Sequence, residues 1–159
     1  MADLILGIDV GTTSLKSAVY TYEGKKLASE TIEYELITPK VSYVEAPCNI
    51  YLESIKKSLD SLKIDQQIDT RKIKVVGFSV QGETLCFLDE NGKPLRNAIV
   101  WLDNRAVSQA KKMREKFGDE LCYQVTGQVS FEPCWPATKI LWVKENEPQI
   151  FEKTKHIVL

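Results

Sequence analysis

The chain has 159 residues, of which 43% are hydrophobic and 27% are charged. This length suits one globular domain or at most two small ones, and the composition excludes disordered, collagen-like and low-complexity classes. The 21 basic and 22 acidic residues leave a formal net charge of -1, without the basic excess of most nucleic-acid binders. No apolar run approaches the ~20 residues that cross a bilayer, and the N-terminus lacks signal-peptide features. We therefore expect a cytoplasmic protein that binds neither nucleic acid nor membrane.

The cysteine and histidine content excludes several kinds of site. Cys48, Cys86, Cys122 and Cys134 are at least 12 positions apart, so no CxxC redox or zinc-ribbon pattern is present. His156 is the only histidine, which argues against a multi-histidine metal centre. We expect the cysteines to be reduced and packed in or near a core.

The first half of the chain predicts three strands, a helix and a further strand. Residues 4–10 form a short apolar run typical of a buried strand, and a polar turn separates them from a second strand at 15–20. Residues 26–36 alternate as a third strand of an antiparallel meander. Apolar residues then recur at helical spacing over 49–64, and the β-branched run 74–80 predicts a buried central strand.

The second half mixes short strands with helices. The sequence predicts strands at 84–88 and 98–101, then a helix that Gly118 ends. A helix over 137–144, a helical turn from Pro148 and a strand at 156–159 complete the pattern. This order predicts a mixed α/β fold with a partly antiparallel sheet flanked by helices, rather than the strand–helix alternation of a doubly wound sheet.

The segment from Asp9 to Lys16 carries the strongest chemical signal. A carboxylate at a strand end can hold hydrated Mg²⁺, and Gly11 permits a tight turn. The hydroxyls of residues 12–14 and the backbone N–H groups can surround phosphate oxygens, while Lys16 can add positive charge. Positioning, a metal and donors around developing charge are what phosphoryl transfer requires. An ordinary β-hairpin turn, which favours the same residue types, is the alternative.

This segment resembles the phosphate-binding hairpin of the FGGY carbohydrate kinases, which belong to the actin-like ATPase superfamily. Four later segments resemble the family in the same order. They are Gly77-Phe78-Ser79-Val80-Gln81-Gly82-Glu83-Thr84, Ile99-Val100-Trp101-Leu102-Asp103-Asn104-Arg105, Thr126-Gly127 and Ala137-Thr138-Lys139-Ile140-Leu141-Trp142. The resemblance covers the whole chain from residue 4, and it implies an actin-like (ribonuclease H-like) ATPase domain that uses ATP and Mg²⁺.

The resemblance implies roles for the hairpin residues. Asp9 would hold Mg²⁺, directly or through water, near the nucleotide phosphates. The phosphates themselves would be bound by Gly11, Thr12, Thr13, Ser14 and Lys16.

The resemblance also implies a substrate site for a sugar or polyol. Its residues would be Gln81, Gly82, Glu83, Asp103, Cys134 and Trp135. A carboxylate such as Glu83 can accept two hydroxyl hydrogen bonds, which suits a polyol. Gly82 and Cys134 stand where glycerol kinase has an arginine and a tyrosine, so the sequence favours xylulokinase-like or gluconate kinase-like substrates over glycerol.

Alternatives remain for several of these residues. An internal salt bridge or a helix cap explains Asp103 and Arg105 as well as substrate contact does. Trp135 can pack on the C–H side of a sugar or in the core. We interpret Lys139 and Trp142 as structural residues.

The resemblance implies that residues 1–159 form most of the N-terminal domain of a longer, two-domain kinase. The general base would lie in the second actin-like domain, so this chain would contain no catalytic residue and would be inactive alone. A homodimer of the parent is compatible with the family. The alternative is a stand-alone nucleotide- or sugar-binding regulatory domain without catalysis.

Overall fold

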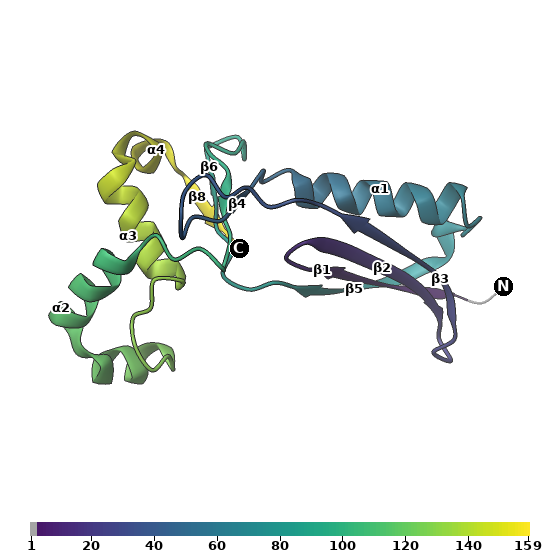
Figure 1. Ribbon diagram of the computed structural model, residues 1–159. Coiled ribbons are helices and arrows are strands. Elements are labelled where there is room, and N and C mark those ends of the chain that lie inside the picture. Colours follow the sequence, from purple (N-terminus) through teal and green to yellow (C-terminus); the bar gives the residue numbers. More distant parts are fainter. Residues whose placement is uncertain (1–2) are drawn as a thin grey trace. The chain divides into compact units, whose positions relative to one another are not determined.

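The computed structural model describes residues 3–159 and divides the chain into two compact units (Figure 1). Unit 1 consists of Met1–Glu35 and Asn49–Gln81, and unit 2 consists of Leu36–Cys48 and Gly82–Leu159. The chain therefore crosses from one unit to the other three times, after residues 35, 48 and 81. Each unit has its own core and is described by itself.

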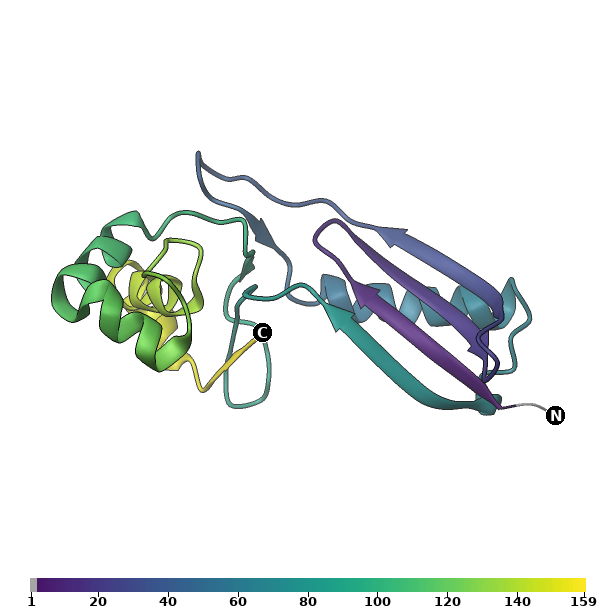
Figure 2. The ribbon, with the colours of Figure 1, turned by 90° about the horizontal axis from the view of Figure 1, so that it is seen from below.

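Unit 1 is a four-stranded sheet with one long helix. The strands are β1 (Leu4–Val10), β2 (Ser14–Thr21), β3 (Lys26–Glu33) and β5 (Ile73–Val80), arranged in the order β3-β2-β1-β5. The helix α1 (Ile50–Ile64) runs along one face of this sheet, as Figures 1 and 2 both show. A short 3-10 helix, η1 (Thr70–Lys72), precedes β5. β1 is antiparallel to β2 and parallel to β5, so the predicted mixed sheet is confirmed.

Alternation along β1 and β2 builds the core of unit 1. Leu4, Leu6, Ile8 and Val10 are buried on the helix side, whereas Asp9 is exposed on the opposite face. This is the period of two that a strand imposes on its side chains. Residues of α1 and the segments beside it cover the same apolar surface, including Leu62, Ile55 and Leu59.

The expected burial of β5 is wrong, although its strand assignment is confirmed. β5 is an edge strand of the sheet, and Val75, Val76, Phe78 and Val80 are 47–63% exposed. The β-branched run was sufficient to predict an extended backbone. Burial of a strand also requires a neighbour on its outer side, and the described residues provide none.

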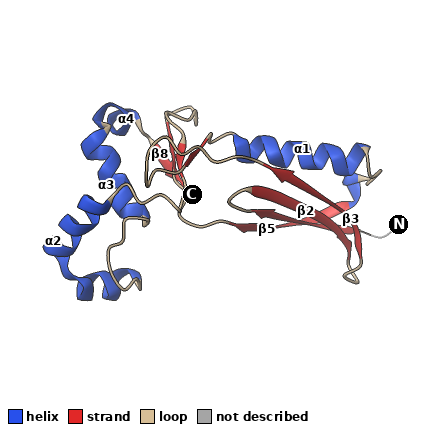
Figure 3. Ribbon diagram, in the orientation of Figure 1, coloured by secondary structure: helices blue, strands red, loops and turns tan. Residues whose placement is uncertain are grey.

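Unit 2 combines short strands with three helices (Figure 3). Its strands pair as β4 (Glu45–Ala46) with β7 (Ala98–Ile99) and as β6 (Cys86–Leu88) with β8 (His156–Val158), both antiparallel. Its helices are α2 (Val107–Thr126), α3 (Pro136–Asn146) and α4 (Pro148–Lys153). Leu85, Phe87, Ile99 and Val143 form its buried core. The sequence did not predict β4, because two residues are too few to show a periodicity.

Gly118 interrupts α2 but does not end it. Its backbone has φ 75° and ψ 158°, and helical structure resumes until Thr126. Gly127, with φ 76°, then provides the left-handed C-cap that terminates the second segment. The predicted helix end at Gly118 is therefore a kink between two helical segments.

Two further expectations concern the whole chain. The four cysteines are free in the structure, and Cys122 is buried while the other three are partly buried. Within residues 3–159, no helix is both long and apolar enough to span a bilayer.

A matched pair of leucines on α1 tests the packing of unit 1. Leu62 is fully buried against the sheet, whereas Leu52 is 72% exposed on the same helix. Leu62→Ala should lower the free energy of unfolding by about 2–5 kcal/mol, because it removes buried methyl groups and leaves a cavity. Leu52→Ala should change it by less than about 0.5 kcal/mol. Urea unfolding of both variants checks this, and equal effects would contradict the packing.

Candidate functional site

The tip of the β1–β2 hairpin is a tight turn that requires glycine. The Gly11 N–H donates to the carbonyl of Ser14 at 2.9 Å and closes a turn through Thr12 and Thr13. A side chain at Gly11 would place its Cβ 2.8 Å from the Ser14 carbonyl oxygen, a distance that real Cβ atoms essentially never show. The phosphate-binding candidates at positions 11–14 therefore form one compact turn directly after β1.

Asp9 and Lys16 lie opposite each other on adjacent strands. They are register partners in the β1–β2 ladder, and both are exposed on the sheet face opposite α1. Ser79 is the partner of Asp9 on the other side, in β5. A carboxylate, an ammonium group and a hydroxyl thus line one row across three strands, immediately before the turn.

A shallow cavity of about 590 Å³ covers this face and is lined by Asp9, Lys16 and Ser79. The residues at the bottom of the cavity have small side chains or none: Gly7 pairs with Gly77 on one side and with Ala18 on the other. A Cβ at Gly77 would meet nothing within 4 Å, so internal packing does not require this glycine. The open floor leaves room for a ligand beside the Asp9 carboxylate.

Tyr34 supports the hairpin tip from within unit 1, a role that the sequence did not reveal. Its hydroxyl donates to the Gly11 carbonyl at 2.5 Å, and its N–H donates to the Thr13 carbonyl at 2.9 Å. The ring is buried and meets Tyr51 of α1 edge-on, with centroids 5.8 Å apart. Burial and then the nearby Asp9 charge raise the pKa of Tyr34. No sequence signal links residues that are 23 positions apart.

The environment of Asp9 fits a hydrated magnesium ion better than a fully protein-bound metal. Within residues 3–159, no three His, Cys, Asp or Glu side chains gather into a metal-binding cluster. Mg²⁺ usually keeps several waters and binds through one or two carboxylates together with substrate phosphates. The single exposed carboxylate of Asp9 beside the turn suits this mode.

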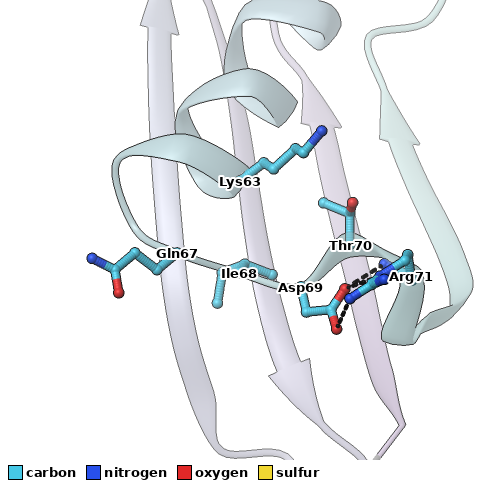
Figure 4. A pocket seen from close by; sticks show the side chains of 6 residues that line it. All are labelled: Lys63, Gln67, Ile68, Asp69, Thr70 and Arg71. Carbon is cyan, nitrogen blue, oxygen red and sulfur yellow. Dashed lines mark hydrogen bonds and ion pairs between the residues drawn. The ribbon is translucent and has the colours of Figure 1, made fainter.

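A second hollow in unit 1 contains none of the predicted site residues. It has a volume of about 480 Å³ and lies after α1, where Lys63, Asp69 and Arg71 line it (Figure 4). Asp69 accepts from the Arg71 guanidinium at 2.8 Å, and the Arg71 side chain is 89% exposed. This exposed ion pair explains the local structure without a ligand.

The predicted substrate segment crosses from unit 1 into unit 2 between Gln81 and Gly82. The Gln81 N–H donates to the Val10 carbonyl at 2.9 Å and extends the β1–β5 pairing. The Gln81 side-chain oxygen is buried, and no group of the described residues donates to it. A buried acceptor without a partner is costly in a folded protein and is a candidate for a ligand hydroxyl.

Glu83 has an unusual backbone conformation. It is a non-glycine residue with φ 65°, in the left-handed backbone region that residues other than Gly, Asn and Asp rarely adopt. Its carboxylate is partly buried, and burial raises the pKa of Glu83 while the Lys139 charge opposes this shift. Such strained residues persist only where surrounding contacts hold them.

Lys139 of α3 provides one of these contacts. Its side chain is fully buried, and Nζ donates to the carbonyls of Val100 at 3.0 Å and Glu83 at 3.4 Å. Burial lowers the pKa of Lys139 to about 8, whereas the charges of Asp103, Cys134 and Glu83 act in the opposite direction. The residue lies in unit 2 together with the substrate candidates Glu83 and Cys134.

Cys134 and Trp135 lie directly before α3. The Trp135 backbone is extended at the N-terminus of the helix, where Pro136 occupies the first turn. The Trp135 indole N–H is buried without an acceptor among the described residues. Burial raises the pKa of the Cys134 thiol, and the Lys139 charge lowers it. A buried donor without a partner is a candidate for a hydrogen bond to a ligand.

Asp103 forms an internal ion pair, which is one of the alternatives that the sequence left open. It is fully buried, and both oxygens accept from Arg105, with Nε at 2.9 Å and Nη2 at 2.8 Å. The Val44 N–H also donates to its Oδ2 at 2.6 Å. With every oxygen engaged inside the protein, Asp103 holds the segment around residue 105.

Aromatic rings and further charges surround Arg105. Its guanidinium carbon lies 4.1 Å from the ring centroid of Tyr43 and 4.9 Å from that of Trp142. Arg105 also donates to Glu45 at 2.7 Å, and Arg96 connects Glu45 with Glu147. The W-x-D-x-R and A-x-K-x-x-W segments of the sequence therefore meet in unit 2 through the cation–π contact of Arg105 with Trp142.

Comparison with known proteins gives consistent matches along the chain. A model of the "FGGY family of carbohydrate kinases, N-terminal domain" matches residues 4–159. The xylulose kinase of Lactococcus lactis is 32% identical over 155 residues, which are 98% of this chain but 30% of that protein. The chain thus spans less than a third of the length of this relative.

Solved structures agree with this result. The crystal structure of gluconate kinase from Lactobacillus acidophilus superposes with a TM-score of 0.90 at 30% identity, over 99% of this chain and 31% of that one. Plasmodium falciparum glycerol kinase, crystallised with ADP, gives a TM-score of 0.85 at 29% identity, over 96% and 30% respectively. These likenesses confirm the predicted actin-like α/β fold class.

Removal of the Tyr34 hydroxyl tests the support of the hairpin tip. Tyr34→Phe should lower the free energy of unfolding by about 1–2 kcal/mol, because the Gly11 carbonyl loses its donor inside the protein. Amide exchange at residues 11–14 should also accelerate. Tyr22→Phe is the control, because Tyr22 is 55% exposed. Equal stability of both variants in urea unfolding would contradict the role of Tyr34.

The buried ammonium group of Lys139 should make stability depend on alkaline pH. Below a pH of about 8 both folded and unfolded chains carry the charge, and its burial costs stability. Between about 8 and 10.5 only the unfolded chain keeps the proton, so this cost disappears as pH rises. Relative to Lys139→Met, the wild type should gain up to roughly 3 kcal/mol over this range.

Urea unfolding of both proteins at pH 7 and pH 10 measures this gain. Lys144→Met, at an exposed position on the same helix, serves as the control. A difference in unfolding free energy between wild type and Lys139→Met that stays constant with pH would show that the Lys139 ammonium is not buried as described.

Proposed function

The chain belongs to the FGGY family of carbohydrate kinases, and we propose that residues 1–159 form most of the N-terminal domain of an ATP-dependent sugar or polyol kinase. The complete protein would transfer the γ-phosphate of ATP to a carbohydrate hydroxyl. The observation that carries this proposal is the row of Asp9, Lys16 and Ser79 beside the glycine-closed turn. ATP as phosphate donor accords with a cytoplasmic location, and a homodimer of the complete protein accords with the family.

The hairpin would bind the nucleotide phosphates. Backbone N–H groups and the hydroxyls of Thr12, Thr13 and Ser14 are suitable donors for phosphate oxygens, and Gly11 allows the turn to approach them closely. Lys16 lies opposite Asp9 and would neutralise phosphate charge. Tyr34 would keep the turn in place, because it binds the carbonyls of the turn from behind. A turn held in advance loses little entropy when it binds phosphate.

Asp9 would hold Mg²⁺ directly or through water. When bound, this ion neutralises charge on the transferred phosphoryl group. The remaining task of Asp9 is to orient the ion relative to the turn, and the pairing of β1 on both sides fixes the strand that carries it.

Within unit 2, the substrate would bind at Gly82, Glu83, Cys134 and Trp135, and Gln81 directly precedes this set in the chain. The Glu83 carboxylate would accept hydrogen bonds from two hydroxyls, and the unpartnered indole N–H of Trp135 would donate to an oxygen of the same kind of ligand. Gly82 adds no side chain beside Glu83, which leaves space for a larger substrate than glycerol. We therefore favour a pentulose or an aldonate. Asp103 would contribute through Arg105 rather than by contact.

The residues of this chain bind and orient but provide no general base. Glu83 is the carboxylate of this chain that comes closest to a candidate general base, but we assign it to binding the substrate hydroxyls. The base that takes the proton from the attacking hydroxyl would come from the second domain of the complete protein. By this proposal, the 159-residue chain alone would not transfer phosphate.

Two carboxylate substitutions in the complete protein separate the proposed roles. Asp9→Asn should lower kcat on the order of 10²–10³-fold, because the metal-bound phosphoryl group loses its orientation. Glu83→Gln should raise the KM for the sugar roughly 10-fold or more and leave the KM for ATP unchanged, because a charged hydrogen bond is worth about 1.5–3 kcal/mol.

Steady-state kinetics with each substrate varied in turn measure these effects. Asp60→Asn, at an exposed position on α1, is the control and should behave as wild type. If Glu83→Gln changed only the KM for ATP, the substrate role of Glu83 would be refuted.

A further inference from the structure

Two hydrogen bonds within unit 2 hold the segment of Glu83 and Thr84. Lys139 Nζ donates to the Glu83 carbonyl at 3.4 Å. The Trp101 N–H donates to Thr84 Oγ1 at 3.1 Å. Since Glu83 has a φ of 65°, its backbone would relax toward a commoner conformation without such contacts. The direction in which the Glu83 side chain leaves the backbone depends on this φ.

Packing alone does not explain Lys139, because a buried ammonium group lowers the stability of the fold. Its side chain is fully buried, yet no carboxylate of the described residues forms a salt bridge with it. An ammonium group in such a place costs stability unless its donors are satisfied, and an apolar residue of similar volume would avoid the cost. The two carbonyls that it reaches belong to Glu83 and Val100, so its charge acts on the backbone of these two segments.

The second carbonyl connects Lys139 to the rigid part of unit 2. Val100 is fully buried, and its N–H donates to the Val44 carbonyl at 3.0 Å. The Val100 carbonyl also accepts from the Asp103 N–H at 2.9 Å. One ammonium group thus joins the strained Glu83 peptide to a segment that the Asp103–Arg105 ion pair fixes.

We propose that Lys139 is a positioning residue, which holds the Glu83 peptide in its left-handed conformation and thereby sets the direction of the carboxylate that binds the sugar. This inference rests on the proposed substrate role of Glu83 and deepens it. By this proposal Lys139 acts on the substrate only through the Glu83 peptide, because its own side chain is fully buried. The electrostatics agree, since the Lys139 charge counteracts the rise that burial causes in the pKa of Glu83.

The wild-type chain tests the contact without any substitution. The 159-residue chain, labelled with ¹³C and ¹⁵N, is titrated from about pH 6 to about pH 10 by NMR. The carbonyl carbons of Glu83 and Val100 should shift together with the Lys139 side chain, whose pKa lies at about 8. The buried carbonyl of Ala98 is the internal control. A Glu83 carbonyl that does not follow Lys139 would overturn the proposal whatever the substrate is.

Hydrogen exchange then tests whether Lys139 holds the segment. Lys139→Met should accelerate amide exchange of residues 83–85 by roughly 10-fold or more while the sheet of unit 1 stays protected. Lys139→Arg keeps a cation and should restore most of the protection. Lys144→Met, on the exposed side of the same helix, should leave exchange unchanged. Unchanged exchange in Lys139→Met would overturn the proposal.

Kinetics of the complete kinase separate this inference from the proposed function. Lys139→Met should raise the KM for the sugar roughly 5-fold or more with little change in the KM for ATP, and Lys139→Arg should recover it. Faster exchange of residues 83–85 combined with an unchanged KM for the sugar would refute Glu83 as a substrate residue, and with it the positioning role. If the wild-type protein itself turned over no sugar, that result would instead contradict the kinase assignment alone.

A pH profile adds a readout that loss of packing would not produce. The charged groups that face Lys139 are Glu83, Asp103 and Arg105, together with the thiol of Cys134. The KM for the sugar should rise several-fold between about pH 7 and about pH 9 in the wild type, because a neutral amine makes weaker hydrogen bonds than an ammonium group. Lys139→Arg should flatten this rise. If Cys134→Ser flattened it and Lys139→Arg did not, the thiol would be the titrating group and the proposal would be wrong.

Discussion

The pairing of β1 on both sides is the constraint on which unit 1 depends. An antiparallel neighbour at β2 and a parallel neighbour at β5 fix every residue of the strand, and buried leucines and isoleucines lock it against α1. Asp9 therefore has a defined position although its own side chain is exposed. The turn that follows is tight enough to exclude any residue but glycine at position 11. The groups that bind a charged ligand can be positioned accurately only when the backbone that carries them is held in one conformation.

In unit 2, buried charges help to fix the backbone positions of the site residues. Its short strands cannot define a surface as an extended sheet does, and buried charges take over part of that task. Arg105 lies between two aromatic rings and two carboxylates, while Lys139 bonds two backbone carbonyls. Buried ionic groups seldom add net stability, but they can specify one arrangement among several. In this chain the arrangement that they specify includes the strained backbone of Glu83.

The sequence predicted the elements of the fold well, because they depend on local patterns. The meander from β1 to β3, the helix α1 and the helix α3 follow from alternation and helical spacing. The exposure of β5 could not be predicted in this way, since a β-branched run looks the same at the edge and in the centre of a sheet. The continuation of α2 beyond Gly118 was missed because a glycine at a kink and a glycine at a helix end give the same signal.

The candidate site was predictable only in part. The hairpin residues are close in sequence, so their proximity in the structure follows from the turn. Tyr34 and Lys139 contribute through hydrogen bonds to residues that are 23 and 56 positions away in the sequence, and neither a spacing nor a motif predicts such contacts. For Asp103 the sequence allowed both substrate contact and an internal ion pair, and the burial of its carboxylate could be known only from the folded chain.

The most direct test is a coupled ADP-release assay of the complete protein with D-xylulose, D-gluconate and glycerol, with the 159-residue chain measured in parallel. We predict ADP release that depends on D-xylulose or D-gluconate for the complete protein and none for the chain alone. No sugar-dependent release by the complete protein would contradict the kinase proposal and favour a binding domain without catalysis. Turnover by the isolated chain would show that the base lies within residues 1–159, which would contradict the role proposed for the second domain.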